Sequence, residues 1–225
     1  MGRSLAGLVV IFDLDGTLID TAADLAAAMN HVLSQNQREP IPVADVRHLV
    51  GSGAKAMIRR GFGLSPDDVI EASLMDRYVD HFLDHYLSNI AEHSRPFPGV
   101  IEAMGALAHE GARFAICTNK REAPAKLLIG SLGLDPFFEA IIGADTTFAA
   151  KPNPAMVSFC LEKTGARSAI FVGDSDTDIK TAQAANLPCL FHNSGYGPAT
   201  LSGNCRYVFD DYERFADLVR TAAQL

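Results

Sequence analysis

The stretch VVIFDLDGTLID occupies residues 9–20 and decides the fold of the chain. Its first four residues are apolar, which is typical of a strand buried in a sheet. The strand ends at Asp13 and Asp15, whose side chains point the same way because positions i and i+2 of an extended backbone share a face. Two neighbouring carboxylates raise the cost of ionising each other. The pair therefore predicts a cation site or a reaction, and Gly16 allows a sharp turn directly after it.

Strand and helix patterns alternate in the second half of the chain. Strands are expected at residues 113–117, 140–143, 169–172 and 189–191, and helices at 101–109, 124–132, 154–164 and 178–185. This alternation predicts a parallel sheet with helices on both faces, and ligands bind such sheets at the carboxyl ends of the strands. Polar residues that follow predicted strands are therefore expected to converge on one site: Asp13, Asp15, Thr118, Asn119 and Asp174.

Only helical patterns occur between the first strand and the turn at residues 95–100. Helices are expected at residues 21–33, 43–50, 54–62 and 65–87, with Pro66 in the first turn of the last one. The sequence thus predicts an α/β core formed by residues 1–18 and 97–225. Residues 19–96 are predicted to form an all-helical cap domain inserted into that core.

Composition excludes several classes of protein. The formal net charge of −8 disfavours nucleic acids and anionic membranes as partners. No apolar run approaches the roughly 20 residues of a membrane span. The four cysteines show no CxxC pairing or metal-ligand spacing, which favours reduced thiols. We expect a cytoplasmic protein, monomeric or homodimeric, that binds no nucleic acid and no membrane.

Four motifs, in order along the chain, resemble those of the haloacid dehalogenase-like (HAD) superfamily of phosphohydrolases. They are DxDGTxxD at residues 13–20, a hydrophobic strand ending in Thr118, KPxP at residues 151–154 and GDxxxD at residues 173–178. The resemblance covers essentially the whole chain. It implies a Rossmann-like core and hydrolysis of a small phosphorylated metabolite that depends on Mg²⁺.

The resemblance also implies a role for each catalytic residue. Asp13 would be the nucleophile that forms an acyl phosphate, and Asp15 would be the general acid and base. Thr118 would donate a hydrogen bond to a phosphoryl oxygen, and Lys151 would bridge Asp13 and the phosphoryl group. Further contacts to the substrate are expected from Gly16, Thr17 and Asn119.

A magnesium site follows from the same resemblance. Asp13, the backbone carbonyl of Asp15 and Asp174 would bind the ion, and Asp178 would hold a metal-bound water. Hard oxygen ligands and a substrate phosphate suit Mg²⁺. The ion would also shield an anionic substrate from the carboxylates.

The predicted cap contains a glycine turn, Gly51-Ser52-Gly53, followed by a helix that carries Lys55 and Arg59. The turn and Arg60 resemble the cap loop and helix of phosphoglycolate phosphatases, which implies 2-phosphoglycolate as substrate. Backbone N–H groups at a helix start can bind an anion, so a substrate carboxylate would suit this segment. A solvated basic face on a cap helix is an equally open interpretation.

Other activities fit the same motifs. A phosphotransferase resembling β-phosphoglucomutase, a pyrophosphatase and a sugar-phosphate phosphatase would share this catalytic set. A binding protein on an inactive scaffold is disfavoured because all the catalytic residues are present. The chain departs from the family pattern at Asn186, where relatives usually carry glycine, and asparagine tolerates the same left-handed conformation.

Overall fold

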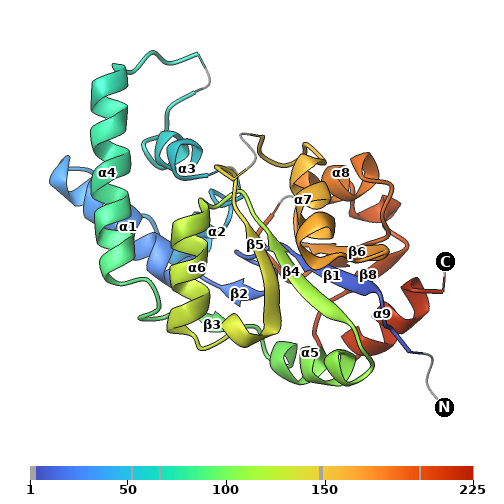
Figure 1. Ribbon diagram of the computed structural model, residues 1–225. Helices are drawn as coiled ribbons and strands as arrows, with labels where there is room; N and C mark the ends of the chain where they lie inside the picture. The colour runs from blue at the N-terminus through green and yellow to red at the C-terminus, as the bar shows by residue number, and fades with distance from the viewer. Residues whose placement is uncertain (1–3, 52, 66, 147–148, 198, 225) are drawn as a thin grey trace.

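The computed structural model describes residues 4–51, 53–65, 67–146, 149–197 and 199–224. Within these residues, a six-stranded parallel sheet has the order β5-β4-β1-β6-β7-β8 (Figure 1). The strands are β1 (Leu8–Phe12), β4 (Arg113–Cys117), β5 (Phe138–Ile142), β6 (Ser168–Gly173), β7 (Cys189–His192) and β8 (Tyr207–Phe209). The prediction of a parallel α/β sheet is confirmed, and β8 adds an edge strand that the sequence analysis did not anticipate.

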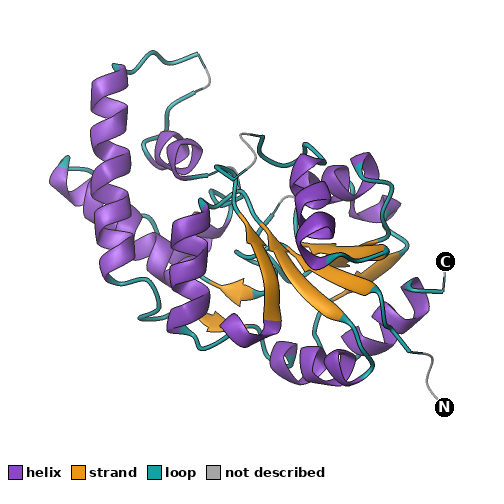
Figure 2. Ribbon diagram, in the orientation of Figure 1, coloured by secondary structure: helices purple, strands orange, loops and turns teal. Residues whose placement is uncertain are grey.

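Strand β1 lies at the centre of the sheet, between β4 and β6, and all five of its residues are buried. Val10 and Phe12 face one apolar cluster, and Val9 and Ile11 face the other. Helices α5 (Val100–His109), α6 (Glu122–Ser131) and α9 (Phe215–Ala222) contribute to the first cluster, and α7 (Ala155–Thr164) and α8 (Asp176–Ala184) to the second (Figure 2). Burial on both faces explains why β1 reads as a continuous apolar run.

In the part of the chain that the structure describes, four helices follow β1 before the chain returns to the sheet. They are α1 (Ala22–Gln35), α2 (Val43–Arg47), α3 (Ala54–Gly61) and α4 (Ala72–Ser88). Two short antiparallel strands, β2 (Ile19–Asp20) and β3 (Arg95–Pro96), flank them, and we call residues 21–94 the helical insert. Helix α1 packs against α2 and α4, beside the sheet in Figure 1. The expected helical character of this segment is confirmed, and its status as a separate domain stays a prediction.

The expected helix at residues 65–87 is wrong at its start, because α4 begins only at Ala72. Pro66 lies outside the described residues. The backbone N–H of Ser65 donates to the carboxylate of Asp68, and the Arg59 guanidinium donates to the carbonyls of Ser65 and Asp68. These bonds satisfy the polar groups of a turn, so this segment does not continue as a helix.

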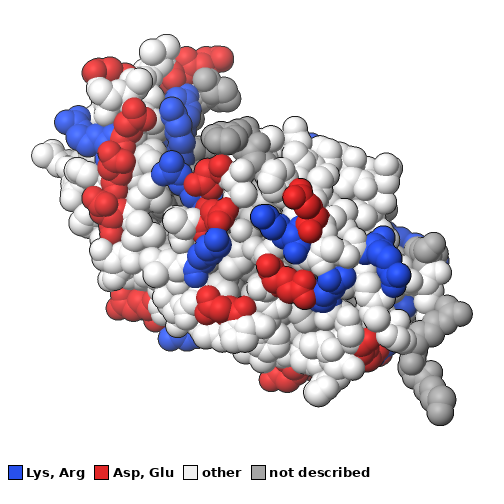
Figure 3. All heavy atoms as spheres, in the orientation of Figure 1, with Lys and Arg blue, Asp and Glu red and all other residues white. Residues whose placement is uncertain are grey.

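Several smaller features complete the fold. Two 3-10 helices span Asp135–Phe137 and Ser202–Asn204. Asn186 has a φ of 54°, as expected for the left-handed position after α8. Among the described residues no helix combines the length and the apolar character that crossing a membrane requires. On the face shown in Figure 3, acidic and basic side chains are interspersed, and several acidic side chains lie along α4.

Candidate active site

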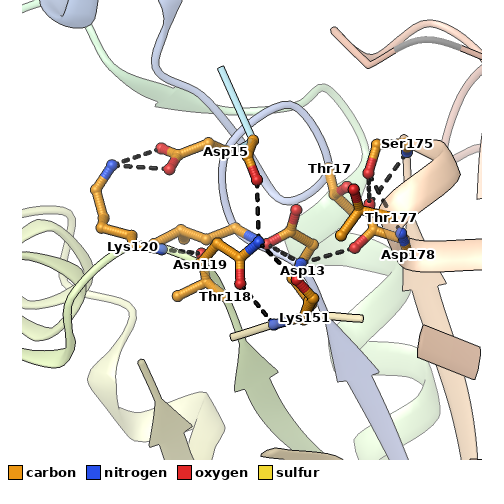
Figure 4. A network of polar contacts seen from close by, with 12 residues as sticks. Asp13, Asp15, Thr17, Thr118, Asn119, Lys120, Lys151, Ser175, Thr177 and Asp178 are labelled. Atoms are coloured by element: carbon orange, nitrogen blue, oxygen red, sulfur yellow. Dashed lines mark hydrogen bonds and ion pairs between the residues drawn. The ribbon is translucent and has the colours of Figure 1, made fainter. Parts of the chain in front are cut away.

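Asp13 lies at the carboxyl end of β1, where its backbone N–H donates to Val172 of β6. Its side chain accepts a hydrogen bond from the N–H of Leu14 at 2.7 Å and contacts Lys151 Nζ at 2.8 Å (Figure 4). Both Asp13 and Lys151 are buried. The ammonium group therefore lies where it can offset negative charge on Asp13, as the sequence analysis expected.

Asp13, Asp174 and Asp178 form a buried acidic cluster, with one carboxylate oxygen of each residue within 4.8 Å of the others. Burial raises the pKa of Asp13 to about 7, with Lys151 opposing the rise and the two other carboxylates adding to it. Burial and the charge of Asp178 raise the pKa of Asp174 to about 6. Three buried carboxylates with oxygen ligands so close together fit a divalent cation, which would relieve their mutual repulsion.

The carboxylate of Asp174 is held by the chain on two sides. It accepts hydrogen bonds from the Thr17 hydroxyl at 2.8 Å and from the N–H groups of Tyr196 at 2.6 Å and Gly197 at 3.0 Å. Thr17, which was expected to contact substrate, thus orients Asp174. Gly195 is required beside it, because a Cβ at that position would lie 2.2 Å from the Asp174 Cβ.

Gly16 is confined in the same way. Its φ is +86°, and a Cβ there would lie 2.5 Å from an oxygen of Asp174. The turn after β1 can therefore pass this close to Asp174 only because residue 16 lacks a side chain.

Asp178 lies in the first turn of α8, where it and Ser175 form a capping box. One carboxylate oxygen accepts from the Ser175 hydroxyl at 2.6 Å, and the other lies 2.7 Å from Lys151 Nζ. Lys151 thus joins Asp13 to Asp178, and the two carboxylates raise its pKa although burial alone would lower it. Asp178 is fully buried and fixes the position of Lys151 as well as belonging to the acidic cluster.

The carboxylate of Asp15 is bound by two side chains. Lys120 Nζ lies 2.8 Å from each of its oxygens, and the Thr21 hydroxyl donates to it at 2.7 Å. Only about a tenth of either side chain in the Lys120–Asp15 pair is exposed. Burial lowers the pKa of Lys120, and Asp15 outweighs that effect and holds it above its usual value. Lys120 therefore stays charged beside the expected general acid.

Thr118 and Asn119 occupy the turn after β4, next to Asp13 in Figure 4. The Thr118 hydroxyl oxygen accepts from the N–H of Lys120 at 3.1 Å. Asn119 accepts from the N–H of Lys151 at 2.8 Å and donates to the carbonyl of Gly51 at 3.1 Å. Asn119 thus connects the Lys151 loop to the helical insert.

A pocket of about 430 Å³ lies between these strand ends and the helical insert. Asp13, Asp15, Thr118 and Asn119 line one side of it, and residues of α1, α3 and α4 line the other. The insert contributes apolar residues to the lining together with the exposed Asp76 and Asp80. The apolar residues are Leu25, Val50, Met57, Val79, Phe82 and Leu83. The predicted residues Gly51, Gly53 and Lys55 also line the pocket, whereas Ser52 lies outside the described residues.

Arg59 takes a different position from the expected one. Its guanidinium group bonds to the loop at residues 65–68, and Arg59 does not belong to the pocket lining that the structure describes. Arg60 donates to the carbonyl of Leu49. Both side chains thus stabilise loops of the insert.

Three residues that sequence reasoning missed contribute to the site: Lys120, Tyr86 and Tyr196. Lys120 directly follows Thr118 and Asn119, so its place in the same turn was a signal that could have been used. Tyr86 has the spacing of an ordinary packing residue on its helix, yet it lines the pocket. Tyr196 lies in a glycine-flanked loop, and its contact with Asp174 depends on how that loop returns to β1.

The chain is similar in sequence to known proteins over most of its length. The sequence profile described as haloacid dehalogenase-like hydrolase matches residues 10–191. The chain is 42% identical over 199 residues to a phosphoglycolate phosphatase of Caulobacter vibrioides, covering 86% of this chain and 82% of the relative. It is 41% identical over 193 residues to one from Agrobacterium fabrum, covering 84% and 81%.

Solved structures show the same fold. A predicted phosphoglycolate phosphatase from Haemophilus somnus superposes with a TM-score of 0.86 at 26% identity, covering 97% of this chain and all of that one. CbbY from Rhodobacter sphaeroides, solved in complex with phosphate, superposes with a TM-score of 0.76 at 20% identity, covering 93% and 95%.

Proposed function

Because the chain belongs to the haloacid dehalogenase-like hydrolases and is a phosphoric monoester hydrolase, we propose that it cleaves 2-phosphoglycolate in a Mg²⁺-dependent reaction. The observation that carries this proposal is the pair Asp13–Lys151 at the end of β1, with Asp15 two residues further on and a pocket above them. The proposal assigns a nucleophile, a charge-neutralising cation and an acid to one short region.

In the first step, an Asp13 oxygen attacks phosphorus and the bond from phosphorus to the ester oxygen breaks. Asp15, in its protonated form, gives its proton to the departing oxygen. In the second step, Asp15 takes a proton from a water molecule that attacks the aspartyl phosphate. Phosphate leaves, and Asp13 is restored as a carboxylate.

Lys151 and Thr118 would act on the phosphoryl group. Lys151 Nζ already lies 2.8 Å from Asp13, so it would also attract an oxygen of the transferring group as negative charge builds up there. The Thr118 hydroxyl, at the end of the neighbouring strand, would donate to another oxygen. Asn119 fixes the backbone of Lys151 and so positions its ammonium group.

The acidic cluster would hold Mg²⁺ through Asp13 and Asp174, and Asp178 would orient water in the ion's shell. The backbone carbonyl of Asp15 would complete the protein ligands. When bound, the ion supplies positive charge that lowers the repulsion between the carboxylates and an anionic substrate. The raised pKa values of Asp13 and Asp174 support this assignment, because they report carboxylates whose charge is poorly compensated by the chain alone.

The choice of 2-phosphoglycolate is supported by the relatives named phosphoglycolate phosphatase and by the cations in the pocket lining. Lys55, Lys120 and Arg121 all line the pocket, and a substrate carboxylate needs at least one of them. The backbone around Gly51 and Gly53 would add N–H donors at the start of α3.

A sugar-phosphate phosphatase is a second candidate, favoured by the pocket volume. A volume of about 430 Å³ falls in the range of pockets that hold drug-sized ligands, which exceed a two-carbon ester. A sugar phosphate would fill more of this space than 2-phosphoglycolate.

The test is phosphate release from a panel of phosphomonoesters that includes 2-phosphoglycolate, glucose 6-phosphate and an aryl phosphate. We expect the highest kcat/KM for 2-phosphoglycolate and loss of turnover when a chelator removes divalent ions. A higher kcat/KM for the sugar phosphate would replace 2-phosphoglycolate by the second candidate. Undiminished turnover in chelator would contradict the magnesium site.

A further inference from the structure

Tyr86 of α4 places a polar atom among the apolar residues of the pocket wall, to which the exposed Asp76 and Asp80 of the same helix also belong. Tyr86 is 2% exposed and lines the pocket. Its ring stacks on the ring of Phe82, with 6.1 Å between the ring centroids. Within the described part of the chain, the Tyr86 hydroxyl is a buried atom with no hydrogen-bond partner. Burial raises the pKa of Tyr86 to about 12, so the phenol keeps its proton and can donate. A buried donor without an acceptor costs free energy unless a ligand supplies one.

Lys120 lies against the same tyrosine. Its Nζ is 4.8 Å from the centroid of the Tyr86 ring and 2.8 Å from both oxygens of Asp15. An ammonium group has three N–H donors, and Asp15 takes two of them. Lys120 also interacts with the Tyr86 hydroxyl and lowers the pKa of Tyr86 against the larger effect of burial. An acceptor that enters the pocket between Asp15 and Tyr86 would therefore contact both groups, and the Tyr86 O–H could donate to it.

Burial distinguishes Lys120 from the other cations that line the pocket. Its side chain is 9% exposed, whereas Lys55 and Arg121 are exposed to solvent. Electrostatic attraction and hydrogen bonds to a substrate are stronger where water is excluded. Arg121 also contacts the carboxylate of Asp145 at 3.8 Å.

From this geometry we propose that the Lys120 ammonium and the Tyr86 hydroxyl together form the subsite that binds the leaving group's carboxylate. This inference rests on the proposed function, because it presumes a carboxylate on the phosphomonoester. Lys120 would hold the substrate carboxylate and Asp15 at once. In 2-phosphoglycolate, one CH₂ group separates that carboxylate from the ester oxygen, so the bridge by Lys120 would place the ester oxygen beside Asp15.

The proposal differs from the expectation drawn from the sequence, which put the carboxylate at the start of α3 with Lys55 or Arg59. Arg59 is bonded to the loop at residues 65–68, and Lys55 is exposed. Lys120 and Tyr86 instead come from the turn after β4 and from α4, so the subsite joins the sheet to the helical insert.

The experiment compares 2-phosphoglycolate with ethyl phosphate, which has the same carbon chain without the carboxylate. Kinetic constants for both are measured with the full-length protein and with the variants Tyr86→Phe and Lys120→Met. We expect Tyr86→Phe to lower kcat/KM for 2-phosphoglycolate about tenfold, the effect of one charge-assisted hydrogen bond, and to change that for ethyl phosphate less than about twofold. Lys120→Met should lower the ratio of kcat/KM for 2-phosphoglycolate to kcat/KM for ethyl phosphate further. Both kcat and KM should contribute to this change.

Matched controls isolate the subsite. Tyr78→Phe removes a hydroxyl on the same helix from a tyrosine that stacks on Phe62, and Lys126→Met removes an exposed cation of α6. Neither residue lines the pocket that the structure describes, so both variants should keep the wild-type ratio. Circular dichroism and thermal unfolding would confirm that each variant is folded.

Two outcomes would overturn the subsite. If Tyr86→Phe and Lys120→Met leave the ratio of the two kcat/KM values unchanged, with or without equal losses for both substrates, these residues support packing or Asp15 alone. Lys55→Met is measured alongside them, and a ratio that falls in this variant alone would move the carboxylate to α3.

Failure of the proposed function is separate. If the wild type prefers another phosphomonoester with an anionic leaving group, 2-phosphoglycolate is wrong as substrate. The subsite then stands if that preference falls in Tyr86→Phe, and is overturned if it does not.

Discussion

Asp13 combines burial with negative charge at one residue. Its pKa is raised to about 7, compared with 3.8 for an unperturbed aspartate, because burial and two neighbouring carboxylates outweigh the attraction of Lys151. A site arranged in this way costs folding free energy unless a cation is bound. This cost in stability indicates that Asp13 serves the function of the protein and not its packing.

We predict that Asp13→Asn stabilises the metal-free protein. Between about pH 4 and pH 7, native Asp13 holds a proton that the unfolded chain releases, so the free energy of unfolding falls as pH rises through this window. Asparagine has no ionisable side chain, so Asp13→Asn removes this fall in the free energy of unfolding. At about pH 8 in chelator, a gain of about 1 kcal/mol would raise Tm by about 2–4 °C.

Thermal unfolding of both proteins across this pH range provides the measurement. The gain should shrink as pH falls toward about 4 and vanish below it, where Asp13 is protonated in both states. Asp84→Asn, an exposed change on α4, serves as the control and should leave Tm unaltered. A lower Tm for Asp13→Asn at about pH 8 would show that the ion pair with Lys151 outweighs the cost of burial.

A second prediction concerns Asp15→Asn. The variant should lose kcat by a factor of about 10²–10⁴ on alkyl phosphates, whose leaving oxygen requires a proton. Formation of the aspartyl phosphate from an aryl phosphate should suffer less, since an aryl oxide leaves without one. Rapid-quench measurement of the first turnover separates this step from hydrolysis of the intermediate. Equal losses in the first step for both ester classes would argue against Asp15 as the acid.

At the scale of single residues, the sequence indicated the charged centre well. Asp13, Asp15 and Asp174 follow apolar strands, and strand ends meet at one edge of a parallel sheet. Lys151 directly precedes the prolines of the KPxP motif. The pairing of Lys120 with Asp15 could not be foreseen, because it depends on how the turn after β4 returns toward β1.

Among the elements, the loop at residues 194–197 packs closely against the acidic cluster. Two of its N–H groups hold Asp174, and Gly195 lies where even a methyl group would overlap that residue. The Tyr196 hydroxyl also bonds to Asp20, and its ring faces Arg47 of α2 at 5.4 Å. This loop therefore contacts the acidic cluster and the start of the helical insert.

We predict that Gly195→Ala raises the Mg²⁺ concentration needed for half-maximal activity. A Cβ at residue 195 must displace Asp174, and disturbing a residue that orients a ligand typically costs about 10–100-fold in metal affinity. The measurement is a Mg²⁺ titration of phosphate release, accompanied by Tm to verify folding. Gly203→Ala is the matched control, because a Cβ there meets no atom within 4 Å. An unchanged titration for Gly195→Ala would mean that Asp174 does not bind the ion.

The start of α4 and the short strand β8 could not be predicted from sequence patterns. The segment at 65–71 was assigned to a helix because its apolar spacing is compatible with one. Arg59, which lies outside this segment, donates to the carbonyls of Ser65 and Asp68, and the Asp68 carboxylate accepts from the N–H of Ser65. These bonds satisfy polar groups of the segment without a helix. Strand β8 was missed because three residues give too short an alternation to distinguish from a loop.

For the whole molecule, the parallel sheet could be anticipated from the alternation of strand and helix patterns along the chain, and the helical segment from the absence of strand patterns between its ends. The order of the strands within the sheet was not predicted. The distance between the helical insert and the sheet could not be anticipated, since it depends on contacts such as Asn119 with Gly51. The pocket volume follows from that distance, and so does the choice between substrates of different size.

We predict that the insert approaches the sheet when the site is filled. The pocket is larger than a two-carbon ester, so excluding water around 2-phosphoglycolate requires closure. Small-angle X-ray scattering should give a smaller radius of gyration with Mg²⁺ and beryllium fluoride, a mimic of the aspartyl phosphate, than with Mg²⁺ alone. Asp13→Asn should show no such decrease. An unchanged radius in the wild type would favour a larger substrate that fills the open pocket.

The pairing of β2 with β3 has a consequence for how such enzymes diversify. Ile19 lies opposite Pro96 and Asp20 opposite Arg95, so the insert leaves and re-enters the sheet at neighbouring points. Paired antiparallel residues are separated by only about 5 Å between Cα atoms, a gap that a two-residue turn can close. We therefore expect residues 21–94 to be exchangeable as a cassette, with a different helical segment grafted onto the same two strands. Recombination at the paired strands β2 and β3 would change which leaving group the pocket accepts. The residues of the core that act on the phosphoryl group would stay the same.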